Sequence, residues 1–565
     1  MKTKLLFTSA FAIFCLMLNI NAQTVHYAKK GISQGFENGN AIVADDSGNV
    51  YVTGQFEYTS VFDNRTLSSY GSHDIFVAKY NSSGNIVWIK SAGGTDGDIG
   101  MGIGIDAQHN VYITGEIEKT VRFSSTISLT SSGGNDIFIA KYDANGNVRW
   151  AKKFGDANSS DKGRAIAVAP NGNCYVTGNF SNSMTIGPST ISSDGGNDIF
   201  TAKFDSNGNG IWAKRGGGSR QDRGHGIAID ANENVFVTGG MTSPARFHGT
   251  TITNSGKYST FLVKYNSSGS FQWVKAAGDC CDTTEANAIA LDGSGNIYLT
   301  GSFAAQTKFS STTLNSTSGS RDVYVAKYNS SGSVQWAKKF GGSGEDVGHG
   351  IAVDKINNRV HVTGFVTTAG SISGKAYSFA GYKDVIVASY GTDGSIKWVK
   401  TYGGTRRDIG LAVATNSQGF VYTTGLFNGT ALFGSFTLVG YPNQPWADFF
   451  VTKISSPVNS TPQLSLTGVN DAMFNQSFDR TRNIGETENE LGKVIVYPNP
   501  TSDDFHFNAA SIISFRLYNS YGLLVGFKEN VNSEIAFGEE LSPGLYFLEL
   551  YSENEKRTIS VVKTE

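Results

Sequence analysis

The segment Asp45-Asp-Ser-Gly-Asn-Val-Tyr-Val-Thr-Gly54 is one copy of a unit that recurs along most of this 565-residue chain. Its closing Thr-Gly returns at steps of 61 to 63 residues. A second marker, a Trp followed by a small or β-branched residue and Lys, keeps the same period, and two independent markers with one period indicate a repeat architecture. Because the Trp recurs in six equivalent copies, we interpret it as a residue that packs between repeats. The repeat glycines are Gly54, Gly115, Gly178, Gly239, Gly301, Gly364 and Gly425, and the tryptophans are Trp88, Trp150, Trp212, Trp273, Trp336 and Trp398.

Each repeat is predicted to contain four strands. In one repeat, residues 224–230 lead through a turn into residues 235–238, which is the pattern of a β-hairpin. After a polar connection, a second pair follows, as in residues 136–142 and 148–152 of another repeat. No window shows sustained helical periodicity, so the fold is predicted to be nearly all β. Four-stranded units repeated radially describe a seven-bladed β-propeller.

The phase of the repeats predicts how the ring closes. Seven Thr-Gly hairpins are followed by only six Trp strands, and the missing strand matches residues 26–31 at the other end of the chain, where Tyr27 lies 61 residues before Trp88. We therefore predict that this N-terminal strand completes blade seven beside the strand at residues 448–453. Such closure removes a free sheet edge that invites aggregation.

Three sequence segments together resemble the SBBP β-propeller repeat family, with the match covering residues 23–455. They are the Asp-x-x-Gly-Asn-Val-Tyr-Val-Thr-Gly hairpin, the Asp-Ile-Phe-Val-Ala-Lys-Tyr-Asn strand and the Gly-Asn-Val-x-Trp-Ala-Lys strand. Ser259 replaces the Asp that begins the third strand elsewhere, and Ser389 replaces the repeat Lys. These departures put local strand pairing in question but leave the fold prediction unchanged.

The N-terminus has the pattern of a signal peptide, residues 1–22. Lys2 and Lys4 precede an apolar run at residues 5–18, and Ala22 offers a small residue for cleavage before Gln23. The run is too short to span a bilayer as a helix, and no later segment reaches 18 uninterrupted apolar residues. The mature chain is expected to be exported and to have no transmembrane segment.

The C-terminus is predicted to form a second, smaller domain. Residues 456–493 have a linker composition, and residues 494–565 alternate like a small antiparallel β-sandwich. Their motif order resembles the type IX secretion C-terminal sorting domain of Bacteroidota; an ordinary adhesion-type sandwich is the alternative. The resemblance implies passage through the periplasm, the type IX machinery as partner, and a secreted or outer-membrane surface location. The residues of this pattern are Tyr497, Pro498, Asn499, Pro500, Gly544, Tyr546 and Lys563.

An acidic residue recurs just before the innermost strand of the blades, with Thr284 as the exception. Crowded carboxylates at a channel mouth would attract a cation such as Ca²⁺, or a cationic ligand. The alternative is that each one accepts backbone N–H bonds in its own turn, and repetition favours this structural interpretation. Ca²⁺ is the only cofactor that the sequence suggests. The acidic residues are Glu37, Asp98, Asp161, Asp222, Asp346 and Asp408.

Cysteines and histidines give weaker signals. Cys280 and Cys281 lie in a connection between blades, where a strained vicinal disulfide and two free thiols are both open. Cys174 is interpreted as a small core residue. His225 and His349 occupy the same repeat position two blades apart, each between glycines, and packed or solvated histidines are favoured over metal ligands there.

The composition bounds the function. With 46 Lys+Arg against 48 Asp+Glu, the net charge of −2 provides no basic field for nucleic acid. Gly-x-Ser-x-Gly, His-Glu-x-x-His and phosphate-loop motifs are absent, so no catalytic residue is predicted. The predicted function is a secreted or cell-surface binding or scaffold module for polysaccharide or protein. The alternative is an extracellular glycan hydrolase or lyase with its site at the propeller channel mouth.

Overall fold

The computed structural model divides the chain into two compact units, Met1–Thr461 and Pro462–Glu565. In the first unit the structure describes residues 23–456 except 158, 255–257, 278–282 and 443. In the second it describes seven strands. The predicted signal peptide up to Ala22, the predicted linker after Ser456, and Cys280 and Cys281 lie outside the described residues.

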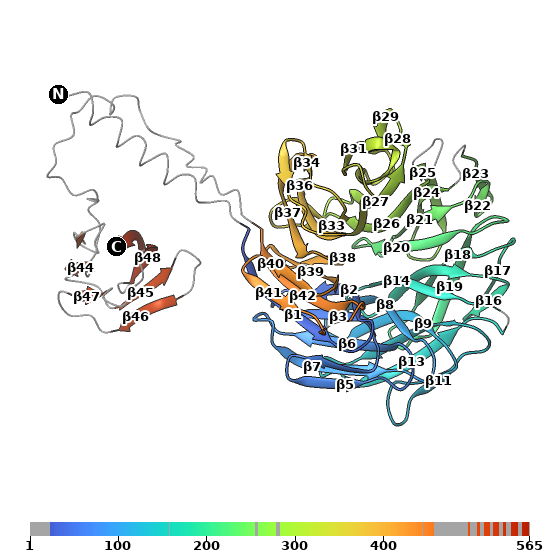
Figure 1. Ribbon diagram of the computed structural model, residues 1–565, viewed down its shortest axis with the longest axis horizontal. Coiled ribbons are helices and arrows are strands. Elements are labelled where there is room, and N and C mark those ends of the chain that lie inside the picture. Colours follow the sequence, from blue (N-terminus) through green and yellow to red (C-terminus); the bar gives the residue numbers. More distant parts are fainter. Residues whose placement is uncertain are drawn as a thin grey trace. The chain divides into compact units, whose positions relative to one another are not determined.

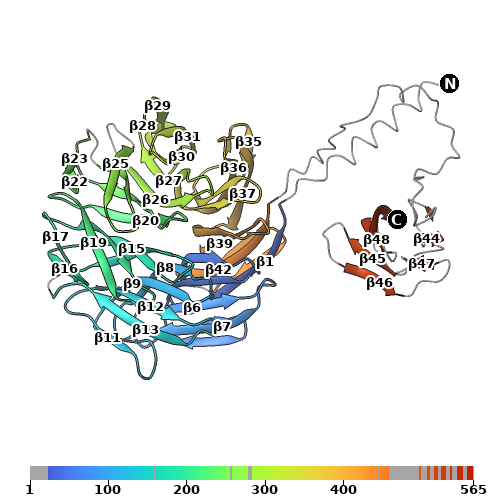
Figure 2. The same cartoon turned by 180° about the vertical axis from the view of Figure 1, so that it is seen from behind.

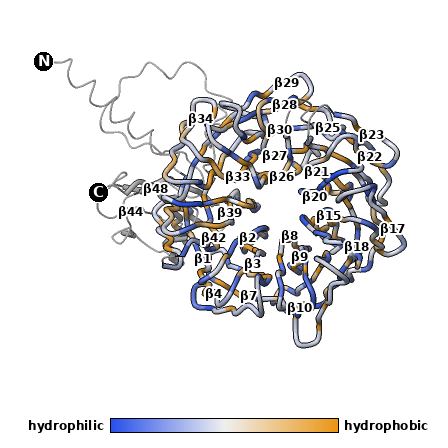
Figure 3. The backbone as a smooth tube through the Cα atoms, turned by 45° about the vertical axis from the view of Figure 1, so that its right-hand side comes forward, coloured by the Kyte–Doolittle hydropathy of each residue, from blue (hydrophilic) through white to orange (hydrophobic). Residues whose placement is uncertain are grey.

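The first unit is a seven-bladed β-propeller, as predicted (Figures 1 and 2). Figure 3 shows the blades arranged around a common centre. From the centre outward, the blades are β2(Asn38–Ala44), β3(Val50–Phe56), β6(Asp74–Tyr80), β7(Ile86–Ala92); β8(Ile99–Ile105), β9(Val111–Ile117), β12(Asp136–Tyr142), β13(Val148–Phe154); β14(Lys162–Val168), β15(Cys174–Phe180), β18(Asp198–Phe204), β19(Gly210–Gly217); β20(Arg223–Ile229), β21(Val235–Met241), β24(Ser259–Tyr265), β25(Phe271–Ala277); β26(Thr284–Leu291), β27(Ile297–Ala304), β30(Arg321–Tyr328), β31(Val334–Phe340); β32(Val347–Asp354), β33(Arg359–Val366), β36(Asp384–Gly391), β37(Ile396–Gly404); and β38(Ile409–Thr415), β39(Phe420–Phe427), β42(Asp448–Ser455), β1(Val25–Ile32).

The core lies between neighbouring blades. Every residue of β3, β9, β15 and β21 is buried, because both faces of these middle strands are covered by adjacent sheets. Strands covered on both faces read as continuous apolar runs instead of alternating ones. Ser259 and Ser389, the two departures from the repeat, keep regular ladder partners in Met241 and Trp398.

The N-terminal strand β1 closes the ring, which confirms the prediction from the repeat phase. It pairs antiparallel with β42, with Tyr27 opposite Lys453 and Gly31 opposite Phe449. Blade seven therefore takes three strands from one end of the propeller segment and one from the other.

The connections between second and third strands are not simple loops, as the sequence suggested, but short hairpins. In three places the hairpin adds to the outer strand of the preceding blade, where β4 pairs with β1, β22 with β19 and β40 with β37. Buried Phe62, Phe247 and Phe433 anchor these hairpins. They thereby cover outer strands that would otherwise be open edges. The hairpins are β4(Thr59–Phe62)–β5(Arg65–Ser68), β10(Thr120–Arg122)–β11(Ser128–Thr130), β16(Ser183–Ile186)–β17(Ser189–Ser192), β22(Ala245–Phe247)–β23(Thr250–Ile252), β28(Gln306–Phe309)–β29(Thr312–Asn315), β34(Gly370–Ile372)–β35(Lys375–Tyr377) and β40(Thr430–Phe433)–β41(Phe436–Val439).

Five of the six repeat tryptophans pack on a turn glycine of the next blade, and Trp398 donates to Ser456 Oγ at 3.4 Å instead. The Trp88 indole N–H donates to the carbonyl of Ala144 in the outer turn of the following blade, at 3.0 Å. Its ring lies against Gly146 of that turn, so closely that an added Cβ would be 2.7 Å from the ring. Gly146 also has a φ of +80°, which L side chains adopt at a cost. The equivalent pairs are Trp150–Gly208, Trp212–Gly269, Trp273–Gly332, Trp336–Gly394 and, across the closure, Tyr27–Gly84.

The second repeat marker, Thr-Gly, has an equally direct explanation. The Thr53 hydroxyl donates to the carbonyl of Phe76 on the third strand of its own blade, at 2.8 Å. The same oxygen faces Gly100 of the next blade, where an added Cβ would lie 2.3 Å away. The marker glycine Gly54 faces the carbonyl of Asn38, which an added Cβ would approach to 1.8 Å.

The second unit contains two small antiparallel sheets, in agreement with the predicted β-sandwich. Phe515, Leu517, Tyr546 and Leu548 are buried in it. The sheets are β43(Ile495–Tyr497)–β44(Phe505–Asn508)–β47(Ile535–Phe537) and β46(Leu524–Glu529)–β45(Ser514–Asn519)–β48(Gly544–Tyr551)–β49(Lys556–Lys563).

The closure predicts the effect of removing β1. A variant that begins at Gly35 should aggregate or lose its cooperative thermal transition, because β42 then becomes an open edge. Circular dichroism melting and light scattering would measure this. A variant beginning at Val25, which keeps β1, is the control, and a synthetic peptide of residues 23–34 should restore the transition. An unchanged melt without β1 would contradict the role of this strand.

The tryptophan contact predicts a difference between two glycine substitutions. Gly146→Ala and Gly249→Ala both place Ala at a φ near +80°, but an added Cβ at Gly249 meets nothing within 4 Å. Backbone strain alone should cost Gly249→Ala about 1–2 kcal/mol. Gly146→Ala should lose about 1–3 kcal/mol more because Trp88 must move. Chemical denaturation would measure both; equal losses would contradict the docking role of Trp88.

Candidate functional site

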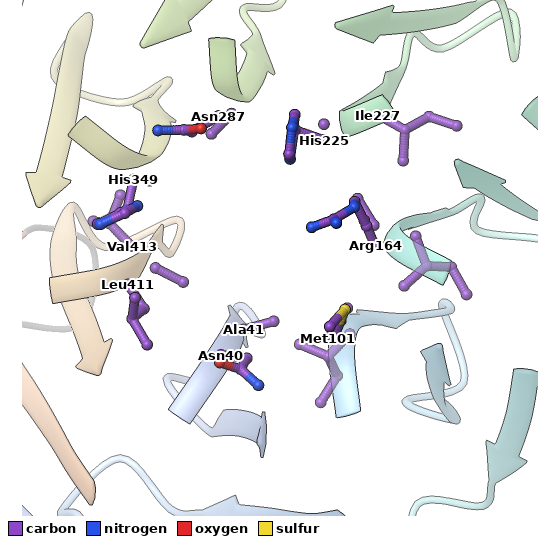
Figure 4. Close-up of a pocket in the computed structure, with 18 of the residues that line it drawn as sticks. Asn40, Ala41, Met101, Arg164, His225, Ile227, Asn287, His349, Leu411 and Val413 are labelled. Atoms are coloured by element: carbon purple, nitrogen blue, oxygen red, sulfur yellow. The ribbon is translucent and has the colours of Figure 1, made fainter. Parts of the chain in front are cut away.

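A central cavity of about 510 Å³ runs between the seven inner strands. Each inner strand carries a β-bulge at the same place; in β2, for example, the register shifts between Gly39 and Ala41 and leaves Asn40 unpaired. A bulge re-aims the extra side chain, and here it aims it into the cavity (Figure 4). The seven bulged residues are Asn40, Met101, Arg164, His225, Asn287, His349 and Leu411.

Most polar side chains of this ring are bonded to the propeller itself. The Asn40 amide donates to the carbonyl of Gly100 at 2.9 Å, and that of Asn287 to Gly348 at 2.8 Å, so both connect adjacent blades. Arg164 Nε donates to Asn179 Oδ1 at 2.9 Å. These bonds make the ring primarily a structural feature of the channel.

The two histidines of the ring are the pair that the sequence singled out. His225 Nε2 lies 2.8 Å from Glu285 Oε1. Burial, with the nearby charges of Lys383 and Arg407, lowers the pKa of His349 to about 4, which makes it neutral at pH 7. Among the described residues, no group of three or more His, Cys, Asp or Glu side chains is placed to hold a metal ion.

The acidic residues predicted for the channel mouth are fully buried between blades, and none of them is among the described residues that line the central cavity. The five aspartates among them accept hydrogen bonds from backbone N–H groups. Asp408, for example, accepts from Gly404 at 2.7 Å and from Asn428 at 3.1 Å. Asp98, Asp161, Asp222 and Asp346 make equivalent bonds.

Each of these acids faces a second buried acid at the start of a third strand. A Cβ added at Gly403 would lie 2.7 Å from Asp408 Oδ2 and 2.8 Å from Asp384 Oδ1, so the two carboxyl groups nearly meet. Where Thr284 replaces the first acid, Ser259 replaces the second, so the pair is lost as a unit. The pairs are Asp74–Asp98, Asp136–Asp161, Asp198–Asp222, Asp322–Asp346, Asp384–Asp408 and Asp448–Glu37.

Burial disfavours ionisation of several of these carboxyl groups. It raises the pKa of Glu37 to about 8 and those of Asp98 and Asp408 to about 7, and the partner carboxylate adds to the rise. The pKa of Asp74 rises to about 6 for the same reason. The interfaces that contain Glu37, Asp98 and Asp408 therefore retain protons near neutral pH.

A second kind of site is found where the repeats stop being alike. Two residues before the third-strand acid, blades six and seven carry Tyr382 and Trp446. These side chains are 68% and 52% exposed. The other blades have only small or basic residues at that position: Ser72, Gly134, Gly196, Lys257 and Ser320.

The two aromatic residues line one cavity of about 440 Å³ together with Arg406 and Arg407. We call this cavity the blade 6–7 groove. Its remaining lining residues are Phe36, Thr405, Asn428, Pro445 and Ala447. No carboxylate is among the described residues that line the groove.

Hydrogen bonds hold the loop that carries Trp446. This loop is longer than its equivalents, since 23 residues separate Gly425 from the third-strand acid, against 20 or 21 elsewhere. Arg406 donates to Asn428 Oδ1 at 3.2 Å and to the Gln444 carbonyl at 3.1 Å. The Asn428 amide donates to the Pro445 carbonyl at 2.8 Å. The groove is therefore preorganised.

Arg407 connects the groove to the channel. It lines the groove and also an adjoining cavity of about 390 Å³, which reaches the channel residues His349 and Leu411. The adjoining cavity is lined by basic and acidic side chains, and two of them, Lys383 and Glu345, form an ion pair at 3.0 Å. Sequence reasoning missed the groove, although aligning the seven repeats would have exposed Tyr382 and Trp446 as departures.

Comparison with known proteins identifies the C-terminal unit. Residues 495–564 match the family described as secretion system C-terminal sorting domain. The chain is thus a seven-bladed propeller with a type IX sorting domain, which implies a secreted or cell-surface location. Among the residues of the predicted sorting pattern, Tyr497 is the last residue of β43. Gly544 pairs with Lys563 between β48 and β49, and Tyr546 is buried. Pro498, Asn499 and Pro500 lie outside the described residues.

Two curated relatives resemble the chain. An uncharacterized WD repeat-containing protein of Acanthamoeba polyphaga mimivirus is 26% identical over 54% of this chain and 28% of its own length. The regulatory protein FlaEY of Caulobacter vibrioides is 24% identical over 64% of this chain and 40% of its own length. The chain thus spans less than half of each relative.

Among solved structures, a member of the DUF4221 family from Bacteroides vulgatus is 10% identical, with a TM-score of 0.27, and covers 77% of this chain and 99% of its own. Within the described part of the chain, no helix has the length and apolar character needed to cross a bilayer.

The carboxyl pairs predict that propeller stability falls as pH rises. Carboxyl groups of an unfolded chain titrate near pH 4, whereas Asp74 and Asp98 titrate at about 6 and about 7 in the fold. Between these values the folded state binds more protons, so the free energy of unfolding decreases with increasing pH. His349, whose pKa is lowered, acts oppositely below about pH 6.5.

The substitution Asp74→Asn removes the titrating carboxyl group but keeps its hydrogen bond. The Asn side-chain oxygen can accept the Tyr70 backbone N–H, which donates to Asp74 in the unsubstituted protein. Between about pH 4.5 and pH 7 the melting temperature of this variant should decrease less with rising pH than that of the unsubstituted protein, because the proton that folded Asp74 retains up to about pH 6 is no longer involved. Scanning calorimetry would measure the difference. Asp143→Asn, in a turn where the pKa is already lowered, is the control and should keep the original slope. Identical slopes for Asp74→Asn would contradict proton retention.

Proposed function

We propose that this protein is a secreted or cell-surface β-propeller, built from SBBP-type repeats, that binds polysaccharide in the blade 6–7 groove. In this proposal, residues 1–22 are a signal peptide cleaved before Gln23, and residues 23–455 are the binding module. Residues 456–493 are a linker to the sorting domain at 494–565.

The observation that carries the proposal is the exposed pair Tyr382 and Trp446. Monomeric proteins rarely leave large aromatic side chains grouped in a hollow without a partner. A sugar ring has apolar C–H faces and a polar rim, and aromatic side chains offer a matching apolar face. Two such side chains from adjacent blades, over arginine donors, suit one or two sugar units.

The charge state of the carboxylates supports binding over glycan hydrolysis. Glycosidases need a carboxylic acid of raised pKa beside the substrate. The raised groups here, such as Asp408, are buried between blades. At the mouth, burial of Glu285 opposes ionisation, but its bond to His225 and nearby arginines outweigh burial and lower its pKa. Glu345 is paired with Lys383.

Substitutions in the groove should weaken polysaccharide binding. Trp446→Ala and Tyr382→Ala are each expected to reduce affinity by about tenfold through the loss of one stacking surface. Affinity electrophoresis in gels that contain soluble polysaccharides would measure the effect, followed by calorimetry on those that bind.

Tyr70→Ala is the matched control, because Tyr70 is 65% exposed but lies outside the groove. It should bind like the unsubstituted protein. A result in which none of a broad set of polysaccharides binds would overturn the proposal and direct the search to a protein ligand. Equal losses in Tyr70→Ala and Trp446→Ala would also contradict it.

A further inference from the structure

We infer that the groove selects an anionic glycan, one whose sugars carry carboxylate or sulfate groups, and that Arg407 binds the anionic group. This inference rests on the proposed polysaccharide-binding function and adds the class of ligand.

The two arginines of the groove have different tasks. The guanidinium of Arg406 is occupied by Asn428 and the Gln444 carbonyl and so holds the loop. Among the described residues, none accepts a hydrogen bond or forms an ion pair with the guanidinium of Arg407. Arg407 is exposed and lines two adjoining cavities. Its five N–H donors are thus available to a ligand.

The surroundings leave the charge of Arg407 unbalanced. The neighbouring carboxyl group, Asp408, is fully buried and accepts backbone N–H bonds instead. The two acidic side chains that line the adjoining cavity have other partners: Glu345 pairs with Lys383 at 3.0 Å, and Glu285 with His225 at 2.8 Å. A groove with two arginines and no described carboxylate in its lining has electrostatic complementarity only to an anion.

The seven-fold repeat shows that this charge is specific to blade seven. The residue just before the buried acid is Arg407 there, and no other blade has a basic residue at that position. The basic residue therefore serves no need of the scaffold, which folds the other six interfaces without it. The equivalents are Phe36, Gly97, Ser160, Gln221, Thr283 and Glu345.

The combination of arginine and aromatic groups fits an acidic sugar. The carboxylate of a uronic acid projects from the rim of the sugar ring, so a ring stacked on Trp446 or Tyr382 directs its carboxylate sideways. A guanidinium binds a carboxylate or sulfate through two parallel N–H bonds. An acidic protein segment could also pair with Arg407. It would not offer the flat apolar face of a sugar ring for stacking on Tyr382 and Trp446.

One polymer in two charge states tests the inference. The full chain is titrated with polygalacturonate and with its fully methyl-esterified form, which has the same backbone but no charge. We expect the charged form to bind at least tenfold more tightly, and Arg407→Ala to lower its affinity to that of the ester. Arg407→Lys should restore part of the affinity, since it keeps the charge but not the fork.

Controls separate this inference from the proposed function. Arg149→Ala, which removes an exposed arginine outside the groove, should change nothing, and the melting temperature of each variant checks its folding. A sulfated galactan that binds with the same dependence on Arg407 supports the inference and assigns sulfate as the group.

Equal binding of charged and esterified polymers, unaffected by Arg407→Ala, overturns the anionic preference but keeps polysaccharide binding. If the protein binds none of the polymers in a way that depends on Tyr382 and Trp446, both the anionic preference and the proposed polysaccharide binding are overturned. Binding of an acidic protein in place of any glycan does the same.

Discussion

The contact between an outer-strand tryptophan and the turn glycine of the next blade is the constraint on which the ring depends. The indole needs a glycine beneath it and a carbonyl beside it, and the turn supplies both only when its glycine adopts a positive φ. This contact explains the period of the Trp marker, and the Thr-Gly marker keeps the same period through its own contact between blades, as Thr53 does with Gly100. At the closure, Tyr27 of β1 takes the place of the tryptophan against Gly84. The ring is therefore closed by the kind of contact that five of the tryptophans make, whereas Trp398 donates to Ser456 Oγ instead.

Other repeated residues satisfy buried polar groups, and in one blade a residue of the next blade takes over the hydrogen bonds of a missing acid. Most inner turns use an acid such as Asp106, which accepts a bond from Tyr112. In blade three the equivalent position is Ala169, which cannot accept such a bond. Glu233 of the next blade accepts bonds from Tyr175 and Lys203 in its place. The joint replacement of an acid pair by Ser259 and Thr284 removes two buried carboxyl groups together, and the Thr284 hydroxyl donates to Thr307 Oγ1 at 2.9 Å. A buried polar group without a partner costs more than either solution.

The fold was predictable because the period, the two markers and the missing strand are all properties of the chain read in order. The small hairpins were not predicted, because each strand has three or four residues and pairs with a different blade, as β4 does with β1. The sequence shows that an acid recurs just before the inner strands, but it does not show that such an acid, for example Asp408, faces a second acid, Asp384, between blades. The groove was missed because Tyr382 and Trp446 belong to different repeats. Only the fold, or an alignment of the repeats to one another, brings them together.

A scaffold this constrained restricts where recognition can evolve. Strand residues are tied to the neighbouring blades, and the channel ring is largely bonded to itself, as Asn40 is to Gly100. Free variation is left to the connections above the blades, where binding residues usually collect. Loop length, aromatic content and charge all depart from the repeat at blades six and seven, and they depart together around Arg407. Three independent departures at one place on a symmetric ring support the proposal that this groove binds a ligand, since packing alone would have kept it like the others.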